Sequence, residues 1–194
     1  MTYKDDWKKA IPGHAEVRQL HEAMRDEIRT RWNRSLPYAD ELFDRWERAA
    51  ALGFGARTSV YDACLILGDV SVGEDCWIGP YTILDGTGGG LTIGDHVNIS
   101  AGVQIYTHDT AARALTRGAA AVGRARTNIR DATFIGPQAV ILRGVTIGTQ
   151  CVIGAGALVN RHVPDRSIVF GIPGRVVGHV EVNGDRVEYV YEDQ

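Results

Sequence analysis

Residues 135–154 read IGPQAVILRGVTIGTQCVIG, and this stretch decides the fold. Within it an aliphatic residue returns at every sixth position, at Ile135, Ile141, Ile147 and Ile153. A small or β-branched residue stands four positions after each aliphatic, and glycine often follows the aliphatic directly. A six-residue repeat of this kind is typical of a parallel β-helix, in which each repeat supplies one short strand and one turn.

The same period extends through most of the chain. Its aliphatic positions are Val60, Ile66, Val72, Ile78, Leu84, Ile93, Ile99, Ile105, Ile129, Ile135, Ile141, Ile147, Ile153 and Val159. Three repeats make one coil, so residues about 18 apart stack in aliphatic columns at the spacing of paired strands. An α/β domain would instead alternate uninterrupted apolar strands with helical segments, and no such pattern occurs between Val60 and Val163. The sequence therefore predicts an all-β solenoid.

Composition limits the class of protein. The 194 residues suit one domain, and a formal net charge of −3 without charge runs argues against a nucleic-acid partner. Cys64, Cys76 and Cys151 all occupy the small, inward position of the repeat, so they indicate core residues rather than a metal or disulfide set. Residues 3–7 contain no apolar leader, and no stretch has the length of a membrane span. We expect a cytoplasmic protein without bound metal.

Segments of other character flank the repeat. Residues 1–56 carry a helical period that Ser35, Leu36 and Pro37 interrupt, and its apolar stripe, which includes Trp32 and Trp46, is predicted to cap the first coil. A helix that binds a partner is the alternative. The repeat occupies residues 57–178. Residues 179–194 alternate in polarity around Asn183 and Gly184, which predicts a C-terminal β-hairpin tail with a two-residue turn.

Two interruptions break the repeat. Asp85 to Gly90 adds three residues between Leu84 and Ile93, and its glycines predict a tight bulge; no lysine or helix signal follows that would favour a phosphate-binding loop. Residues 110–128 form a longer insertion that is rich in arginine and contains no acidic residue after Thr110. Loops that leave a rigid scaffold often carry function, so this loop is predicted either to approach ligand phosphates or to be a solvated, mobile excursion.

His108 is the candidate catalytic residue. It stands where the repeat stops and the longer insertion begins, at a position that faces away from the aliphatic column. An imidazole beside a carboxylate suits a general base, because imidazole titrates near neutral pH and the carboxylate can fix its tautomer. Asp109 is adjacent in sequence, but neighbouring side chains on a strand point apart. The orienting group is therefore left open between another carboxylate and a backbone carbonyl.

Several motifs together resemble one family. Residues 93–100, the segment around His108, residues 135–148 and the closing segment 171–177 are similar to those of the hexapeptide-repeat acyltransferases, which include galactoside, maltose and lipopolysaccharide or capsule sugar O-acetyltransferases. The resemblance covers residues 57–178 and implies a left-handed parallel β-helix with an N-terminal helical cap. It also implies a homotrimer with active sites between protomers.

The resemblance further implies acetyl-CoA as donor and a sugar hydroxyl as acceptor, with direct transfer and His108 as general base. The cofactor-binding residues that it implies are Gly136, Ala139, Ala155, Asn160, Arg161 and Arg175. On the acceptor side it points to Asp85, Asp109 and Tyr81. The coil before His108 contains no asparagine, and Asp109 replaces the proline of the galactoside and maltose enzymes. These departures favour a surface-polysaccharide or nucleotide-linked sugar as acceptor.

Three other functions fit the sequence less well. A γ-type carbonic anhydrase needs three zinc histidines, but Tyr106, Pro137 and Leu142 occupy their places, and His96 and His108 do not restore the set. A non-catalytic binding solenoid would show a regular surface without a broken coil. An N-acetyltransferase acting on an amino-sugar nucleotide is the nearest alternative enzyme, because an amine needs less help from a base than a hydroxyl does.

Overall fold

The computed structural model describes residue 8 and residues 10–192, so residues 3–7, which bear on the question of a leader, lie outside the described residues. The chain divides into two compact units, residues 1–44 and 45–194. The first unit contains α1 (His14–Trp32) and α2 (Tyr38–Leu42). Between them lies the interruption that the sequence predicts. Glu41 of α2 is buried, and its Oε2 lies 2.5 Å from Nε2 of His21 in α1.

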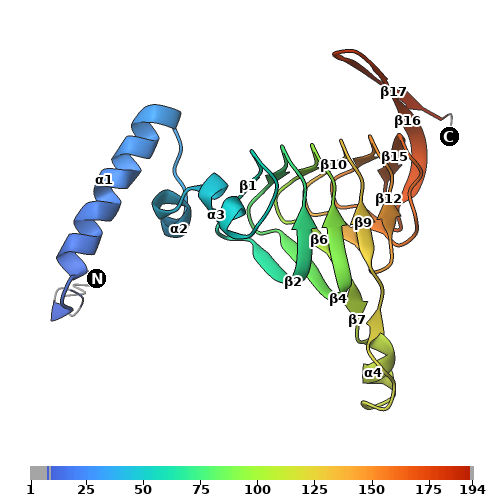
Figure 1. Ribbon diagram of the computed structural model, residues 1–194, viewed down its shortest axis with the longest axis horizontal. Helices are drawn as coiled ribbons and strands as arrows, with labels where there is room; N and C mark the ends of the chain where they lie inside the picture. The colour runs from blue at the N-terminus through green and yellow to red at the C-terminus, as the bar shows by residue number, and fades with distance from the viewer. Residues whose placement is uncertain (1–7, 9, 193–194) are drawn as a thin grey trace, which may run out of the picture. The chain divides into compact units, whose positions relative to one another are not determined.

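The second unit begins with α3 (Arg45–Ala51) and continues into a parallel β-solenoid of about six turns (Figure 1). Ala49 of α3 and the following Phe54 are buried in the same apolar core as the first coil, and Arg48 donates to the carbonyl oxygens of Tyr61 and Cys64. Trp46, which was predicted to pack there, is 47% exposed under the Arg45 guanidinium. Ala49 and Phe54 rather than the Trp46 indole therefore make this contact.

The solenoid has three faces. The first face is one sheet of β1 (Ser59–Val60), β3 (Trp77–Ile78), β5 (Asn98–Ile99), β10 (Phe134–Ile135), β13 (Val152–Ile153) and β15 (Ser167–Phe170). The second face contains the starts of β2 (Leu65–Val72) and β4 (Ile83–Ile93), then β6 (Gln104–Ile105), β11 (Val140–Ile141) and β14 (Leu158–Val159). The third face contains the ends of β2 and β4, then β9 (Thr127–Ile129) and β12 (Thr146–Ile147). Because β2 and β4 bend around a corner, they join the second and third faces.

Stacked aliphatic side chains fill the interior as the period predicts. On the first face Val60, Ile78, Ile99, Ile135 and Ile153 occupy one register column, and each is 0% exposed. The three cysteines are free and buried in the same core. Burial raises the thiol pKa of Cys76 and Cys151. The prediction that the three cysteines lie in the core is confirmed.

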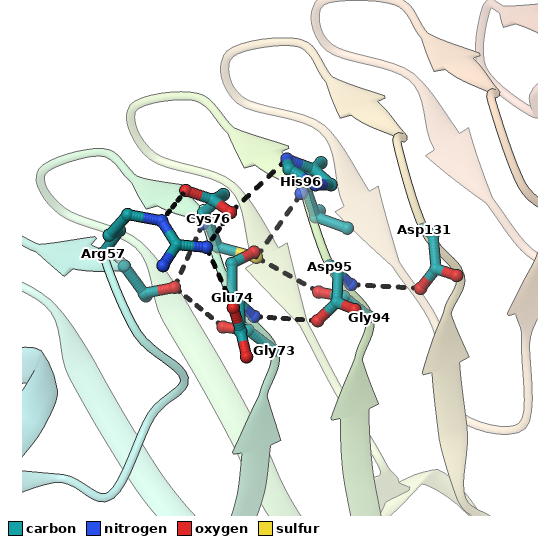
Figure 2. A network of polar contacts seen from close by, with 11 residues as sticks. Arg57, Gly73, Glu74, Cys76, Gly94, Asp95, His96 and Asp131 are labelled. Carbon is teal, nitrogen blue, oxygen red and sulfur yellow. Dashed lines mark hydrogen bonds and ion pairs between the residues drawn. The ribbon is translucent and has the colours of Figure 1, made fainter.

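Carboxylates connect the coils at the corner between the third and first faces, which we call the carboxylate corner. Asp95 Oδ1 accepts the N–H of Glu74 at 2.8 Å, and Asp131 Oδ1 accepts the N–H of Asp95 at 3.0 Å (Figure 2). A Cβ at Gly94 would lie 2.0 Å from Asp131 Oδ1, so glycine follows the aliphatic Ile93 to leave room for the carboxylate of the next coil. These bonds satisfy backbone donors that a strand ladder does not reach.

The chain closes with an antiparallel extension of the first face. β16 (Arg175–Asn183) pairs with β15, and β17 (Arg186–Tyr191) pairs with β16. The predicted hairpin is present, but Asn183 pairs with Arg186, so the turn residues are Gly184 and Asp185. The alternation of polarity predicts the two strands and not their register, which is why the predicted turn is displaced by one residue.

Candidate active site

Both interruptions of the repeat lie at the corner between the second and third faces, which we call the insertion corner. On one coil the three extra residues bulge within β4, opposite Asp69 of β2. On the next coil, residues 108–126 leave the solenoid at the same corner and form β7 (His108–Asp109), α4 (Ala111–Leu115) and β8 (Gly123–Arg124). Thr107 ties the two together, because its hydroxyl donates to the Asp85 carbonyl oxygen at 2.8 Å and accepts the N–H of Gly88 at 2.8 Å.

His108 and Asp85 form a close pair across these two coils. Nδ1 of His108 lies 2.6 Å from Oδ2 of Asp85, whose side chain is 1% exposed, whereas the His108 side chain is 35% exposed. Within the described part of the chain, no hydrogen bond to this buried oxygen is found, so the ion-pair contact with Nδ1 of His108 is its polar contact. The group that the sequence left open is therefore a carboxylate, and it comes from the preceding coil.

Thr87 completes the arrangement. Its backbone N–H and its hydroxyl both donate to Oδ1 of Asp85, at 2.9 and 2.6 Å. Since the single hydroxyl proton is used there, the Thr87 oxygen presents a lone pair to Nδ1 of His108, 3.1 Å away. Both neighbours of Nδ1 are acceptors, so Nδ1 carries a proton and Nε2 of the neutral ring keeps its lone pair.

Asp85 stays ionised in spite of its burial. Burial acts to raise the pKa of Asp85, but the two hydrogen bonds from Thr87 and the neighbouring His108 outweigh it, so the pKa lies below the ordinary value. A carboxylate that is ionised at Nδ1 also stabilises the imidazolium that forms when Nε2 takes a proton. The geometry therefore assigns Asp85 to the orientation of His108, in addition to the acceptor-side role that the resemblance implies.

Gly88 allows this close approach. A Cβ at Gly88 would lie 2.0 Å from the Thr107 carbonyl oxygen and 2.8 Å from Cβ of His108. Real side chains do not fit at such distances, so glycine is required where the bulge packs on the start of the loop. The glycines of the bulge, which the sequence explains only by flexibility, thus have a steric reason as well.

The loop after His108 is ordered by its own contacts. Asp109 pairs with Arg143 of the next coil and accepts the N–H of Ala111 at 3.1 Å. The Arg143 hydrogen bond is the main reason why the pKa of Asp109 is lowered. Asp109, expected to bind substrate, is therefore engaged within the chain. The helix α4 was not predicted, although Ala111 to Leu115 is rich in helix-favouring alanine and leucine.

The remaining expected residues lie at two different corners. Tyr81, Gly136, Ala139 and Ala155 belong to the corner between the first and second faces, which we call the glycine corner. Tyr81 is 63% exposed and has φ 61°, as a turn residue there. A strand of the second face separates this corner from His108. Gly136 has a structural reason of its own, because a Cβ there would lie 2.7 Å from the Ala155 nitrogen.

Two of the expected cofactor residues share the insertion corner with His108. Asn160 and Arg161 follow β14, and continuing the β11–β14 register places Arg161 beside Arg143. Both are exposed, and the Arg161 side chain has no polar partner among the described residues. Arg175 opens β16 and donates to the Gly174 carbonyl oxygen at 3.0 Å. Within one chain, Asn160 and Arg161 thus lie at the same corner as His108, whereas the expected residues of the glycine corner lie apart from His108.

The described residues contain neither a metal-binding cluster nor a membrane-spanning helix. No group of three or more His, Cys, Asp or Glu side chains could hold a metal ion there. Among the same residues, no helix combines the length and the apolar character that crossing a membrane requires.

Comparison with known families matches the repeat itself. A family model described as bacterial transferase hexapeptide (six repeats) matches residues 126–161. A second model, described as the hexapeptide repeat of succinyl-transferase, matches residues 69–107. The chain is also 32% identical over 103 residues to the galactoside O-acetyltransferase of Escherichia coli, an alignment that covers 53% of this chain and 50% of that protein. The chain spans about half the length of this curated relative.

Solved structures show the same architecture. AntD, an N-acyltransferase from Bacillus cereus solved with dTDP and 3-hydroxybutyryl-CoA, is 25% identical with a TM-score of 0.60, over 65% of this chain and 71% of that chain. The hexapeptide-repeat acetyltransferase VCA0836 from Vibrio cholerae, solved with acetyl-CoA, is 27% identical with a TM-score of 0.52, over 88% and 90%. These relatives carry out acyl transfer according to their names, to oxygen in one case and to nitrogen in another.

Proposed function

Because this chain belongs to the hexapeptide-repeat acyltransferase family, we propose that it transfers an acetyl group from acetyl-CoA to a sugar hydroxyl. The observation that carries the proposal is the contact between Nδ1 of His108 and the buried carboxylate of Asp85. It leaves Nε2 as the basic nitrogen of a side chain that is partly open to solvent. A partly exposed base with a fixed tautomer is what the deprotonation of an acceptor hydroxyl requires.

The reaction proceeds by direct transfer. Nε2 of His108 takes the hydroxyl proton while the acceptor oxygen attacks the thioester carbonyl carbon. The bond from that carbon to sulfur then breaks, and the imidazolium returns its proton to the CoA thiolate. Asp85 orients the ring and stabilises its positive charge between these steps. No cysteine takes part, since all three are buried in the core. General-base help of this kind is typically worth about 10²–10⁴ in rate.

The residues present fit acetyl-CoA as the donor. Arg161 offers an exposed guanidinium without a partner in the described part of the chain, two coils beyond His108 at the insertion corner. A guanidinium suits phosphate groups. At the glycine corner Ala155 is exposed and could contact the ligand, whereas Gly136 is buried and Ala139, at 0% exposed, belongs to the core. Acetyl-CoA is a product of central metabolism, so we place the reaction in the cytoplasm.

We further propose a homotrimer with the active site between protomers. The support is the division of the expected residues between two corners of one solenoid. His108, Asn160 and Arg161 lie at the insertion corner, whereas Gly136 and Ala155 lie at the glycine corner. Closed rotational symmetry can bring the insertion corner of one protomer to the glycine corner of the next. Sedimentation of the purified protein tests this, and a monomeric enzyme with full activity would contradict it.

The acceptor that we propose is a sugar of a surface polysaccharide, such as lipopolysaccharide, or a nucleotide-linked sugar. The second candidate function is N-acylation of an amino sugar, which the likeness to AntD favours. The test is thiol release from acetyl-CoA with paired hydroxyl and amino sugars, for the native protein and the His108→Ala variant. O-transfer predicts a fall of about 10²–10⁴ in kcat for the variant. Near-native activity of His108→Ala on an amine would instead establish the second candidate, and no turnover with any acceptor would favour a binding solenoid.

A further inference from the structure

Arg124 lies directly across from the catalytic base. β7 and β8 form a two-stranded antiparallel ladder in which His108 pairs with Arg124 and Asp109 pairs with Gly123. The N–H of Ala125 donates to the Thr107 carbonyl oxygen at 2.9 Å. Thr107 and Ala125, which precede His108 and follow Arg124, therefore occupy a hydrogen-bonded position of the ladder. His108 and Arg124 therefore occupy a non-hydrogen-bonded position, where the two Cα atoms are only about 4.5 Å apart. Side chains that face each other across an antiparallel pair leave the ladder on the same side.

The opposite side of this ladder is occupied. Asp109 is paired with Arg143 there, and a Cβ at Gly123 would lie 3.0 Å from the Arg143 guanidinium. Arg143 thus lies on the side of Asp109 and Gly123, away from His108. Of Arg124 and Arg143, only Arg124 leaves the ladder on the same side as His108.

Other arginines of the loop are engaged in holding it. Arg113 donates to the Gly118 carbonyl oxygen at 3.0 Å. Arg126 donates to the Thr92 hydroxyl at 3.0 Å and lies 4.0 Å from Asp69. Among the described residues, Arg124 has no such hydrogen bond or ion pair, and its side chain is exposed. A free guanidinium on the face of the base is available to a ligand.

We propose that Arg124 binds an anionic group of the acceptor, a phosphate or a carboxylate, close to the hydroxyl or amine that reacts at His108. This inference rests on the proposed acyl transfer and deepens it by naming the acceptor as an anion. The planar guanidinium can donate two parallel hydrogen bonds to either oxyanion. Asp85 cannot attract the same guanidinium in competition, because its side chain is buried and its oxygens already face Thr87 and His108.

The experiment uses inorganic phosphate and acetate as probes of the protein saturated with CoA, so that the CoA phosphate sites are filled. The readout is the imidazole resonance of His108, assigned by its loss in His108→Ala. We expect phosphate or acetate to shift this resonance in a saturable manner, and Arg124→Gln to weaken that binding about tenfold or more, as loss of a charged hydrogen bond implies. Arg124→Lys should retain part of it. Arg117→Gln, a change at the far end of α4, is the matched control and should bind as the native protein does.

The outcomes distinguish a phosphorylated acceptor from a carboxylated one. They also test the role of Arg124 separately from the proposed acyl transfer. A stronger response to phosphate indicates a phosphorylated acceptor, and a stronger response to acetate indicates a carboxylated one. Absence of any response to both, or equal binding by the native protein and Arg124→Gln, overturns the role of Arg124. For acceptors that turn over, Arg124→Gln should raise KM for the anionic member of a matched pair about tenfold while kcat changes little. If no acceptor supports thiol release, the acyl-transfer proposal fails on its own, and the phosphate titration still decides whether Arg124 binds anions.

Discussion

Replacing Asp85 by asparagine tests the arrangement on which the proposed mechanism depends. The carboxylate accepts two hydrogen bonds from Thr87 on Oδ1, and its Oδ2 lies 2.6 Å from Nδ1 of His108. Asparagine has one acceptor oxygen and one NH₂ donor. If its oxygen faces Thr87, the NH₂ group faces Nδ1 and forces the imidazole proton onto Nε2. If its oxygen faces His108, the N–H and the hydroxyl of Thr87 face another donor.

Both orientations carry a cost that can be estimated. The first removes the basic lone pair at Nε2, so kcat should fall by about 10²–10⁴, which is the usual contribution of a general base. The second breaks the hydrogen bonds from Thr87, and a hydrogen bond to a charged group contributes about 1.5–3 kcal/mol of unfolding free energy. We therefore expect Asp85→Asn to lower kcat with little change in the KM for acetyl-CoA. Thiol release measures both constants, and urea denaturation measures the stability.

Asp69→Asn is the matched control, because Asp69 lies at the same corner with its side chain 78% exposed and 4.0 Å from Arg126. It should keep kcat within about threefold of the native value. A folded Asp85→Asn protein whose kcat is also within that range would refute the conclusion that Asp85 fixes the tautomer of His108.

A comparison of the native protein with Asp85→Asn also tests the direction in which the pKa of Asp85 is shifted. Since the pKa of Asp85 is lower in the folded protein than in the unfolded chain, its ionised form stabilises the fold. This contribution is complete above the unfolded value, which is about 4 for aspartate, and is lost as the pH falls through the lower folded value. The part of the stability difference between the native protein and Asp85→Asn that comes from the Asp85 pKa should thus shrink as the pH falls below about 4. A difference that grows as the pH falls below about 4 would contradict the direction of the shift.

Three further predictions concern the scaffold. Gly88→Ala should lower both activity and unfolding free energy, the latter by about 1–3 kcal/mol, because its Cβ would meet the Thr107 backbone, whereas Gly184→Ala at the open hairpin turn should leave activity unchanged. The three buried thiols should resist a thiol reagent in the native protein and react in urea, and rapid native labelling would show that the core is not closed. Ile78→Ala and Ile153→Ala, three coils apart, should each cost about 2–5 kcal/mol and add within about 0.5 kcal/mol, whereas the stacked pair Ile99 and Ile135 should deviate from additivity in calorimetry.

The sequence predicts the scaffold well because its signals are local. The aliphatic period, the inward cysteines and the three-residue bulge each follow from residues within a few positions of one another. The Asp85 carboxylate beside Thr87 also has a local signal that was overlooked, since aspartate often accepts the N–H two residues ahead. Recognising that turn would have placed the carboxylate at the corner of His108, one coil earlier.

What the sequence does not predict is long-range. The contact between His108 and Asp85 joins residues on successive coils, and its register depends on where the bulge lies within β4. The pairing of Asp109 with Arg143 spans the inserted loop in the same way. The helical period after Pro37 does not predict the break near Phe43 that separates α2, which contacts α1, from α3, which contacts β1.

The base of the inserted loop has a consequence for how this scaffold can change. The Thr127 hydroxyl donates to the Tyr106 carbonyl oxygen at 2.8 Å and accepts the N–H of Gly144 at 3.1 Å, so the chain re-enters the coil at a fixed point. Doubling the length of a loop whose ends are held together costs only about 0.6 kcal/mol. The middle of the loop can therefore be replaced, in evolution or by design, at little cost in unfolding free energy. Recognition of new acceptors can then arise while the coils, and the histidine at the point of departure, stay as they are.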